Sequence, residues 1–150
     1  MLPPYSSRER CDDVSLAYAL LRITLGLNIF MHGVSRLLAG LGNFANVMAK
    51  TFENTPVPTP LVVIFSYSLP WLEGLIGLLI LIGLRTRESL FSGAVLMLLL
   101  TFGTALRQDW NVAAIQLLYS IVYALLIAGL RHNAFSVDQK LFSLPRRGIR

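Results

Sequence analysis

The sequence predicts an all-α integral membrane protein: a four-helix bundle with both termini in the cytoplasm and a short amphipathic helix in the first outer loop. The 150-residue chain is 55% hydrophobic and 14% charged, with a mean hydropathy of +0.63, whereas a soluble domain would be about 25% charged. Its apolar residues form four blocks, each close to the roughly 20 residues that a helix needs to cross a bilayer. The blocks are residues 14–38, 60–84, 89–106 and 112–130. They predict one four-span membrane domain over residues 1–150.

The first block is expected to stay in the protein as a spanning helix. The residues before it are mostly polar, it is longer than the apolar core of a signal peptide, and no Ala-x-Ala cleavage site follows it. In the loop after it, apolar residues recur at helical spacing from Phe44 to Phe52, so the amphipathic helix is expected over residues 43–52.

The remaining connections are short until the chain leaves the last span. Arg85–Glu88 is expected to form a tight turn, and the turn at Arg107–Asn111 places Trp110 in the aromatic belt of the outer face. The tail, residues 131–150, becomes polar and is expected to lie at the membrane surface. Ser136 and Gln139 form a weak capping box there, which predicts a brief interfacial helix.

The net charge of +5 is distributed unevenly over the two predicted faces. Nine Lys and Arg residues lie on the side of the termini, and three, Arg36, Lys50 and Arg107, lie on the other side. The positive-inside rule therefore places both termini in the cytoplasm. We expect a multi-pass protein of a bacterial inner or internal membrane that contacts lipid and other membrane subunits. Nothing in the sequence resembles a nucleic-acid-binding module.

The chain has few residues that could carry redox chemistry. Cys11 is the single cysteine, which excludes an intramolecular disulfide, a Cys-x-x-Cys pair and a cysteine-based metal site. The two histidines, His32 and His132, are predicted on opposite faces, so a bis-histidine haem within one subunit is excluded. We expect no metal site and no covalently bound cofactor. A redox role would need a bound small molecule, such as quinone, or a partner subunit.

Two ionisable residues, Arg22 and Glu73, lie inside the first and second apolar blocks. A charge at the centre of a membrane helix costs roughly 2.5–3.5 kcal/mol on insertion scales, and helix rise places both at similar depths. The sequence therefore predicts a buried salt bridge between them. The pair is either a structural clasp between two spans or part of a polar cavity for a ligand head group or a proton path.

Other polar and aromatic residues of the spans define a candidate pocket for quinone or another ligand. Its members are Asn28, His32, Tyr67, Trp71, Gln116, Tyr119 and Tyr123. For the aromatic members the alternative is packing, and His32 is either a hydrogen-bonded interfacial residue or a proton acceptor for a quinol. Close helix packing is expected at glycines, as between membrane helices in general. These glycines are Gly26, Gly33, Gly74 and Gly77.

Three segments resemble the DoxX-like (DoxX/DoxD) membrane proteins. The first span, LLRITLGLNIFMHGVSRLLAG, has an early arginine, then His-Gly and a basic residue. The second, LPWLEGLIGLLILIGLRTR, has a glutamate, glycine-rich turns and a basic exit, and the end, GLRHNAFSVDQKLF, has Ser-x-Asp after an aromatic residue. The resemblance implies a four-helix membrane bundle linked to redox chemistry, since the namesake group includes the small membrane subunit of thiosulfate:quinone oxidoreductase. The residues that it marks are Arg22, His32, Gly33, Glu73 and Asp138.

Together, the residues and the resemblance predict a membrane subunit of a quinone-linked redox complex. The subunit would anchor its partners and line a pocket for the quinone head group between the first, second and fourth spans. Two alternatives stay open: a purely structural accessory subunit of a larger membrane complex, and a small transporter. A single Arg–Glu pair without an inverted repeat gives the transporter the least support.

Overall fold

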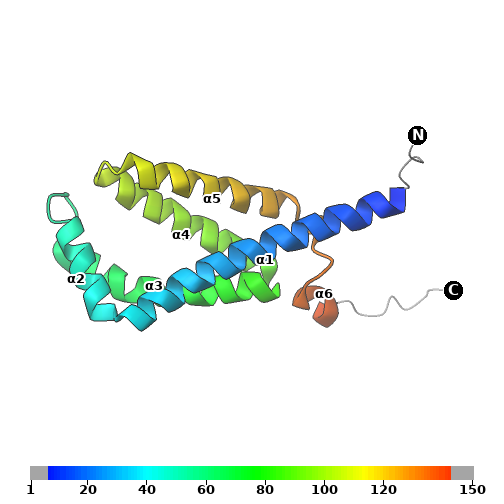
Figure 1. The fold of residues 1–150 in the computed structure, drawn as a ribbon, viewed down its shortest axis with the longest axis horizontal. Helices are drawn as coiled ribbons and strands as arrows, with labels where there is room; N and C mark the ends of the chain where they lie inside the picture. Colours follow the sequence, from blue (N-terminus) through cyan, green and yellow to red (C-terminus); the bar gives the residue numbers. More distant parts are fainter. Residues whose placement is uncertain (1–6, 143–150) are drawn as a thin grey trace.

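The computed structural model describes residues 7–142 as a set of helices (Figure 1). In chain order they are α1 (Ser7–Ala39), α2 (Leu41–Thr51), α3 (Thr59–Ile82), α4 (Thr86–Leu106), α5 (Trp110–Ala128), a 3-10 turn (Leu130–His132) and α6 (Val137–Phe142). Four of them, α1, α3, α4 and α5, are long and apolar enough to cross a membrane. The predicted all-α class and the four spans are confirmed. The last part of the predicted tail, residues 143–150, lies outside the described residues.

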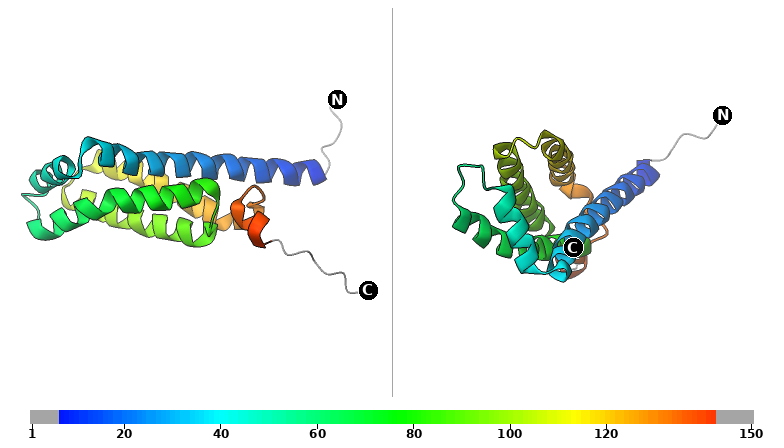
Figure 2. Two further views of the ribbon diagram at one scale, coloured as in Figure 1. Left: turned by 90° about the horizontal axis from the view of Figure 1, so that it is seen from below. Right: turned by 60° about the vertical axis from the view of Figure 1, so that its left-hand side comes forward.

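The four spans form two antiparallel pairs. α1 packs along α3, α4 packs along α5, and contacts between α3 and α4 join the pairs. Figure 1 shows the pairs close together at the α3–α4 turn and further apart at the opposite end, where α2 lies. Figure 2 shows α6 beside the α3–α4 turn. We call these two ends of the bundle the α6 end and the α2 end.

α1 and α3 approach closely because glycines stand where their backbones meet. A Cβ on Gly26 would lie 2.5 Å from the backbone nitrogen of Leu81, and a Cβ on Gly33 or Gly77 would overlap the backbone of the facing helix. The two helix backbones therefore approach closely at these three glycines. A Cβ on Gly74 would meet no atom within 4 Å, so Gly74 contributes only its backbone to the contact with Gly33.

α4 and α5 pack around one large side chain. Tyr123 of α5 is 1% exposed, and its ring occupies the space that a side chain on Gly93 of α4 would fill. Leu90 and Leu126, both fully buried, extend this contact into the core. Tyr123 thus packs in the protein interior, which is the alternative to a role in the predicted pocket.

The turn between α3 and α4 is shorter than predicted. Gly83 ends α3 with a left-handed backbone (φ +70°). The Leu84 N–H donates to the carbonyl of Leu79 at 3.0 Å, and the Gly83 N–H donates to that of Ile80 at 3.2 Å. This is the Schellman arrangement, for which glycine is favoured. α4 already begins at Thr86, inside the predicted turn.

The two short helices are found where the sequence predicts them. α2 covers residues 41–51, against the predicted 43–52, and begins after Gly40, which has φ +94°. Before α6, the hydroxyl of Ser136 accepts the backbone N–H of Gln139 at 3.3 Å. This is one of the two hydrogen bonds of the predicted capping box.

Candidate functional site at the open end of the bundle

Glu73 pairs with Arg36 and not with Arg22. The guanidinium of Arg36 donates a hydrogen bond to the Glu73 carboxylate and so joins α1 to α3. Glu73 is 3% exposed, and a carboxylate buried without a partner would be costly. The predicted salt bridge between Arg22 and Glu73 is wrong.

The error lies in the register of α1 against α3. Gly33 of α1 faces Gly74 of α3. From this contact, Arg36 comes about one helical turn further toward the α2 end, close to Glu73, whereas Arg22 lies roughly three turns away toward the α6 end. The prediction took the edges of the apolar blocks as equal depths, but the glycine contacts set the register.

Arg22 instead connects three segments at the α6 end. Its guanidinium donates to the carbonyl oxygens of Ile80 and Leu81 at 2.7 and 3.0 Å, and to that of Phe135 at 2.6 Å. The first two carbonyls belong to the last turn of α3, where the helix dipole favours a cation. Arg22 is 2% exposed, so these bonds are made inside the protein and tie α1, α3 and the segment before α6 together.

Asp138 makes a second link at the same end. Its carboxylate accepts the backbone N–H groups of Arg85 and Thr86 and the Thr86 hydroxyl, each at 2.7 Å, and its own N–H donates to the Gly83 carbonyl at 3.0 Å. Burial works to raise the pKa of Asp138, but the hydrogen bonds from Thr86 and Arg85, with the nearby charge of Arg22, lower that pKa below its ordinary value. The carboxylate therefore caps α4 in its charged form.

At the α2 end, two arginines attach α2 to both helix pairs. The guanidinium of Arg36 lies over the ring of Phe44, 4.9 Å from its centroid, and that of Arg107 lies over Phe52 at 5.4 Å. Both are cation–π contacts. Because Arg36 belongs to α1 and Arg107 follows α4, α2 bridges the two pairs where they separate.

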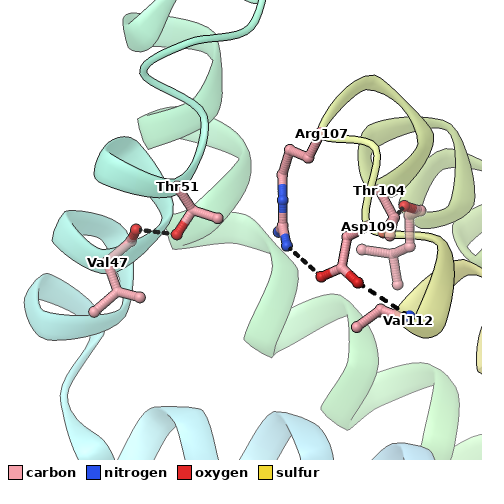
Figure 3. Close-up of polar contacts among 7 residues, drawn as sticks. Val47, Thr51, Thr104, Arg107, Asp109 and Val112 are labelled. Carbon is pink, nitrogen blue, oxygen red and sulfur yellow. Dashed lines mark hydrogen bonds and ion pairs between the residues drawn. The ribbon is translucent and has the colours of Figure 1, made fainter.

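Arg107 also has a carboxylate neighbour. Asp109 accepts a hydrogen bond from the Arg107 guanidinium at 3.0 Å through one oxygen and from the Val112 backbone N–H at 3.2 Å through the other (Figure 3). The second bond caps the start of α5. Figure 3 shows the Arg107 side chain extending from the α4–α5 turn on the side that faces α2. Each of the two arginines that hold α2 is thus neutralised by a carboxylate.

A cavity of about 580 Å³ lies at the α2 end, with walls from α2, α3, α4 and α5 and with Arg36 of α1 in its lining. Most of its lining is apolar, and its polar members are Arg36, Ser68, Thr104, Arg107 and Gln116. The side-chain oxygen of Gln116 is buried and has no hydrogen-bond partner among residues 7–142. A concave, mostly apolar cavity with a few polar groups is the usual form of a small-molecule site, and its volume falls in the common range of roughly 300–1,000 Å³.

The residues of the predicted pocket do not meet in this cavity. Gln116 lines it, but Asn28 and Tyr119 lie on either side of a smaller hollow of about 320 Å³ between α1 and α5. There the Tyr119 hydroxyl donates to the side-chain oxygen of Asn28 at 2.9 Å. The structure therefore divides the predicted pocket between two places.

Three further members of the predicted pocket lie on the outside of the bundle. Trp71 is 62% and Tyr67 is 44% exposed, on a span whose surroundings are lipid. His32 is exposed, and its ring nitrogen Nδ1 lies 2.9 Å from the Asn28 carbonyl of the same helix. The prediction grouped these residues by depth, which does not fix the direction in which a helical side chain points.

The sequence does not predict that Arg36 and Arg107 belong to the site. It marks both as charges that set the topology, and it predicts α2 as a surface helix. One signal was present: Phe44 and Phe52 share the apolar face of an amphipathic helix on the same side of the membrane as both arginines. Within residues 7–142, no group of three or more His, Cys, Asp and Glu side chains is placed to hold a metal ion.

These features define a small four-span membrane protein: a helical bundle closed at one end by backbone contacts of Arg22 and Asp138 and hollow at the other. The family model of methylamine utilisation protein MauE matches residues 14–113, two-thirds of the chain, and the chain belongs to this family, part of the DoxX-like membrane protein clan. The resemblance to DoxX-like proteins is thereby confirmed at the level of the clan. Asp138 lies beyond the matched residues. No curated protein and no solved structure matches the chain.

Proposed function

We propose that this protein is a membrane subunit of a redox system and that it binds an amphiphilic electron carrier, such as a quinone, in the cavity at the α2 end. The cavity is the observation that carries the proposal. Its apolar walls suit a ring and an isoprenoid tail, and Arg36, Arg107 and Gln116 offer hydrogen bonds to ring oxygens.

The family supports a link to oxidative metabolism. Its model is named for methylamine utilisation, and the family is connected with the maturation of methylamine dehydrogenase. With Cys11 as its single cysteine, this chain has no thiol pair to oxidise and reduce, so electrons would pass through the bound molecule or a partner. The chain itself would hold and orient the carrier's head group. His32, the predicted proton acceptor, is not among the residues that line the cavity.

The proposal includes an orientation in the membrane. The α6 end carries most of the basic residues, so the positive-inside rule puts this end in the cytoplasm. The α2 end and its cavity then lie in the outer half of the bilayer. A quinone in that position would be within reach of a redox enzyme on the outer side.

Quinone retention by cavity-filling variants tests the proposal. The protein is purified from native membranes in mild detergent, extracted with solvent, and its quinone is quantified per mole of chain. Leu100→Trp fills the cavity that Leu100 lines, whereas Leu98→Trp places the same ring on the lipid-facing side of the same helix, where Leu98 is 67% exposed.

We expect quinone in the wild type and in Leu98→Trp, and at least a tenfold loss, about 1.4 kcal/mol of binding free energy, in Leu100→Trp. The thermal unfolding of both variants is recorded to show that each is folded. Equal quinone in the two folded variants, or none in the wild type, would contradict the proposal.

A second candidate function, a purely structural accessory subunit, is favoured by the exposure of α5. Only 17% of its span is buried, against 33–39% for the other three spans, and its apolar face includes Leu118, Ile121 and Leu125. Such a face suits contact with another membrane subunit as well as lipid. Under this function, Leu118→Ala with Ile121→Ala would release the partner on a native gel, and Leu100→Trp would leave the assembly unchanged.

A further inference from the structure

We infer that the cavity at the α2 end selects amphiphiles with an uncharged head group that carries acceptor oxygens, and that the two arginine–carboxylate pairs impose this selection. The inference rests on the proposed function, because it concerns the ligand of the same cavity. It adds a chemical rule for which ligand is accepted and names the charged residues responsible.

The arginines give the head-group region its hydrogen-bond donors. A guanidinium has five N–H groups. Within the part of the chain that the structure describes, Arg36 donates to Glu73 and Arg107 donates to Asp109. Because both arginines line the cavity, their other N–H groups are available to a ligand oxygen. A hydrogen bond from a charged donor is roughly twice as strong as one between neutral groups.

The hydroxyls in the lining do not compete for this role. Ser68 donates to the carbonyl of Ile64 at 3.0 Å, and Thr104 donates to that of Leu100 at 2.8 Å, each within its own helix. Their hydrogen atoms are therefore already in use. The side-chain donors left in the described lining are the Gln116 amide and the two guanidinium groups, and the charged guanidinium groups are the stronger. A head group rich in acceptor oxygens matches this arrangement.

The carboxylates remove the attraction that two arginines would otherwise exert on an anion. Glu73 is buried beside Arg36, and Asp109 is partly buried beside Arg107. A ligand carboxylate would lose its hydration on entering the cavity and would meet two pairs without net charge. A ketone or quinone oxygen accepts the same hydrogen bonds and loses far less hydration. The neutral head group is favoured for this reason.

The position of α2 keeps these groups in place. The rings of Phe44 and Phe52 each cover one guanidinium, and the same two phenylalanines form part of the cavity wall. A ligand that enters therefore meets guanidinium groups that are already held by a ring and by a carboxylate. Little ordering of these side chains is needed on binding, which favours affinity.

Asp109→Asn is a suitable change for a test. Asparagine is as good an N-cap as aspartate, so the hydrogen bond to the Val112 N–H can be kept while the negative charge beside Arg107 is removed. The matched control is Asp138→Asn, the same substitution at the cap of α4, at the opposite end of the bundle.

Binding is measured on the full chain in nanodiscs of phosphatidylcholine, by equilibrium dialysis with two radiolabelled probes. One is a benzoquinone with a ten-carbon tail, and the other is dodecanoate. For the wild type we expect the quinone to bind at least tenfold more tightly than dodecanoate. Asp109→Asn should raise the affinity for dodecanoate about tenfold and change that for the quinone less than threefold, and Asp138→Asn should change neither.

The outcomes separate this inference from the proposed function. If the wild type binds the quinone but prefers dodecanoate, or if Asp109→Asn leaves the ratio of the two affinities unchanged, charge compensation does not set the selectivity and the inference is overturned while the proposed function stands. If the wild type binds neither probe, the proposed function fails and the inference fails with it.

Discussion

Replacing Arg22 with methionine should loosen the α6 end of the bundle. Methionine keeps most of the length and apolar volume of the side chain and removes every donor. In the structure the guanidinium donates to the carbonyls of Ile80, Leu81 and Phe135. The Ile80 carbonyl keeps a hydrogen bond from the Gly83 N–H at 3.2 Å. The carbonyls of Leu81 and Phe135 lose the hydrogen bond from Arg22 and have no such replacement among the described residues.

The expected loss of stability follows from these two carbonyls. A buried acceptor left without a partner costs roughly 1–3 kcal/mol, and the guanidinium also loses a favourable position at the end of α3, worth about 0.3–2 kcal/mol. Methionine also removes the cost of burying the positive charge of Arg22, which offsets part of this loss of stability. We therefore expect Arg22→Met to lower the free energy of unfolding by about 2–4 kcal/mol.

Unfolding of Arg22→Met is followed in detergent by tryptophan fluorescence, alongside Arg87→Met. Arg87 is an exposed arginine at the same end, so this control makes the same change in charge and should alter the free energy by less than about 0.5 kcal/mol. Hydrogen exchange adds a local readout: the Asp138 N–H, which donates to the Gly83 carbonyl, should exchange faster in Arg22→Met. If Arg22→Met and Arg87→Met are equally stable, Arg22 does not hold this end together.

Three other predictions concern the register, the packing and the cap of α4. A double-mutant cycle with Arg36→Gln and Glu73→Gln should give a coupling of roughly 0.5–3 kcal/mol, and additive losses would contradict the ion pair. Gly77→Ala should lower the free energy of unfolding by about 1–3 kcal/mol because its Cβ meets the α1 backbone. Gly74→Ala, with open space around its Cβ, should leave stability unchanged or raise it by up to about 1 kcal/mol, and equal effects would count against the packing described. The pKa of Asp138 is lowered in the folded protein, so its stabilisation is complete above the unfolded value of about 3.9 and is lost as the pH falls below it. The difference in unfolding free energy between wild type and Asp138→Asn should therefore shrink as the pH falls from about 4 through the lowered pKa of Asp138, and a difference that grows in acid would contradict the charged cap.

The helices could be predicted because their signals are local. Apolar blocks of spanning length locate α1, α3, α4 and α5, and the period of the apolar residues locates α2. Helix ends were less accurate where the cause is a particular backbone conformation. The left-handed backbone of Gly83 allows α4 to begin only three residues later, at Thr86. The pattern of apolar residues does not predict this backbone conformation.

The partners of the charged residues could not be found from depth alone. Counting residues from the edge of each apolar block assumes that neighbouring helices begin level. The contact of Gly33 with Gly74 shows that they are offset by roughly two and a half helical turns, which makes Arg36 the partner of Glu73 in place of Arg22. The glycines predict the register of α1 against α3 better than depth does. Aligning Gly33 of α1 with Gly74 of α3 as a close contact gives the observed register.

The cavity could not be predicted because it depends on how two helix pairs separate. The pairs lie close together at the α3–α4 turn and separate toward α2 (Figure 1), and this separation depends on contacts between segments far apart in the sequence. The direction of each side chain around its helix decides the lining. Depth alone predicts Trp71 in the pocket, yet its side chain is 62% exposed on the outside of the bundle, whereas Leu100 lines the cavity and carries no sequence signal.

Photolabelling can show where an electron carrier binds on this protein. A quinone with a diazirine in its tail is bound to the full chain in nanodiscs and activated by light, and the labelled peptides are identified by mass spectrometry. If the cavity at the α2 end is the binding site, label will appear on residues 61–69 of α3 and 99–106 of α4, and Leu100→Trp will abolish it. Label confined to the groove at Asn28 and Tyr119, or to the lipid-facing surface around Trp71, would show that the carrier binds elsewhere.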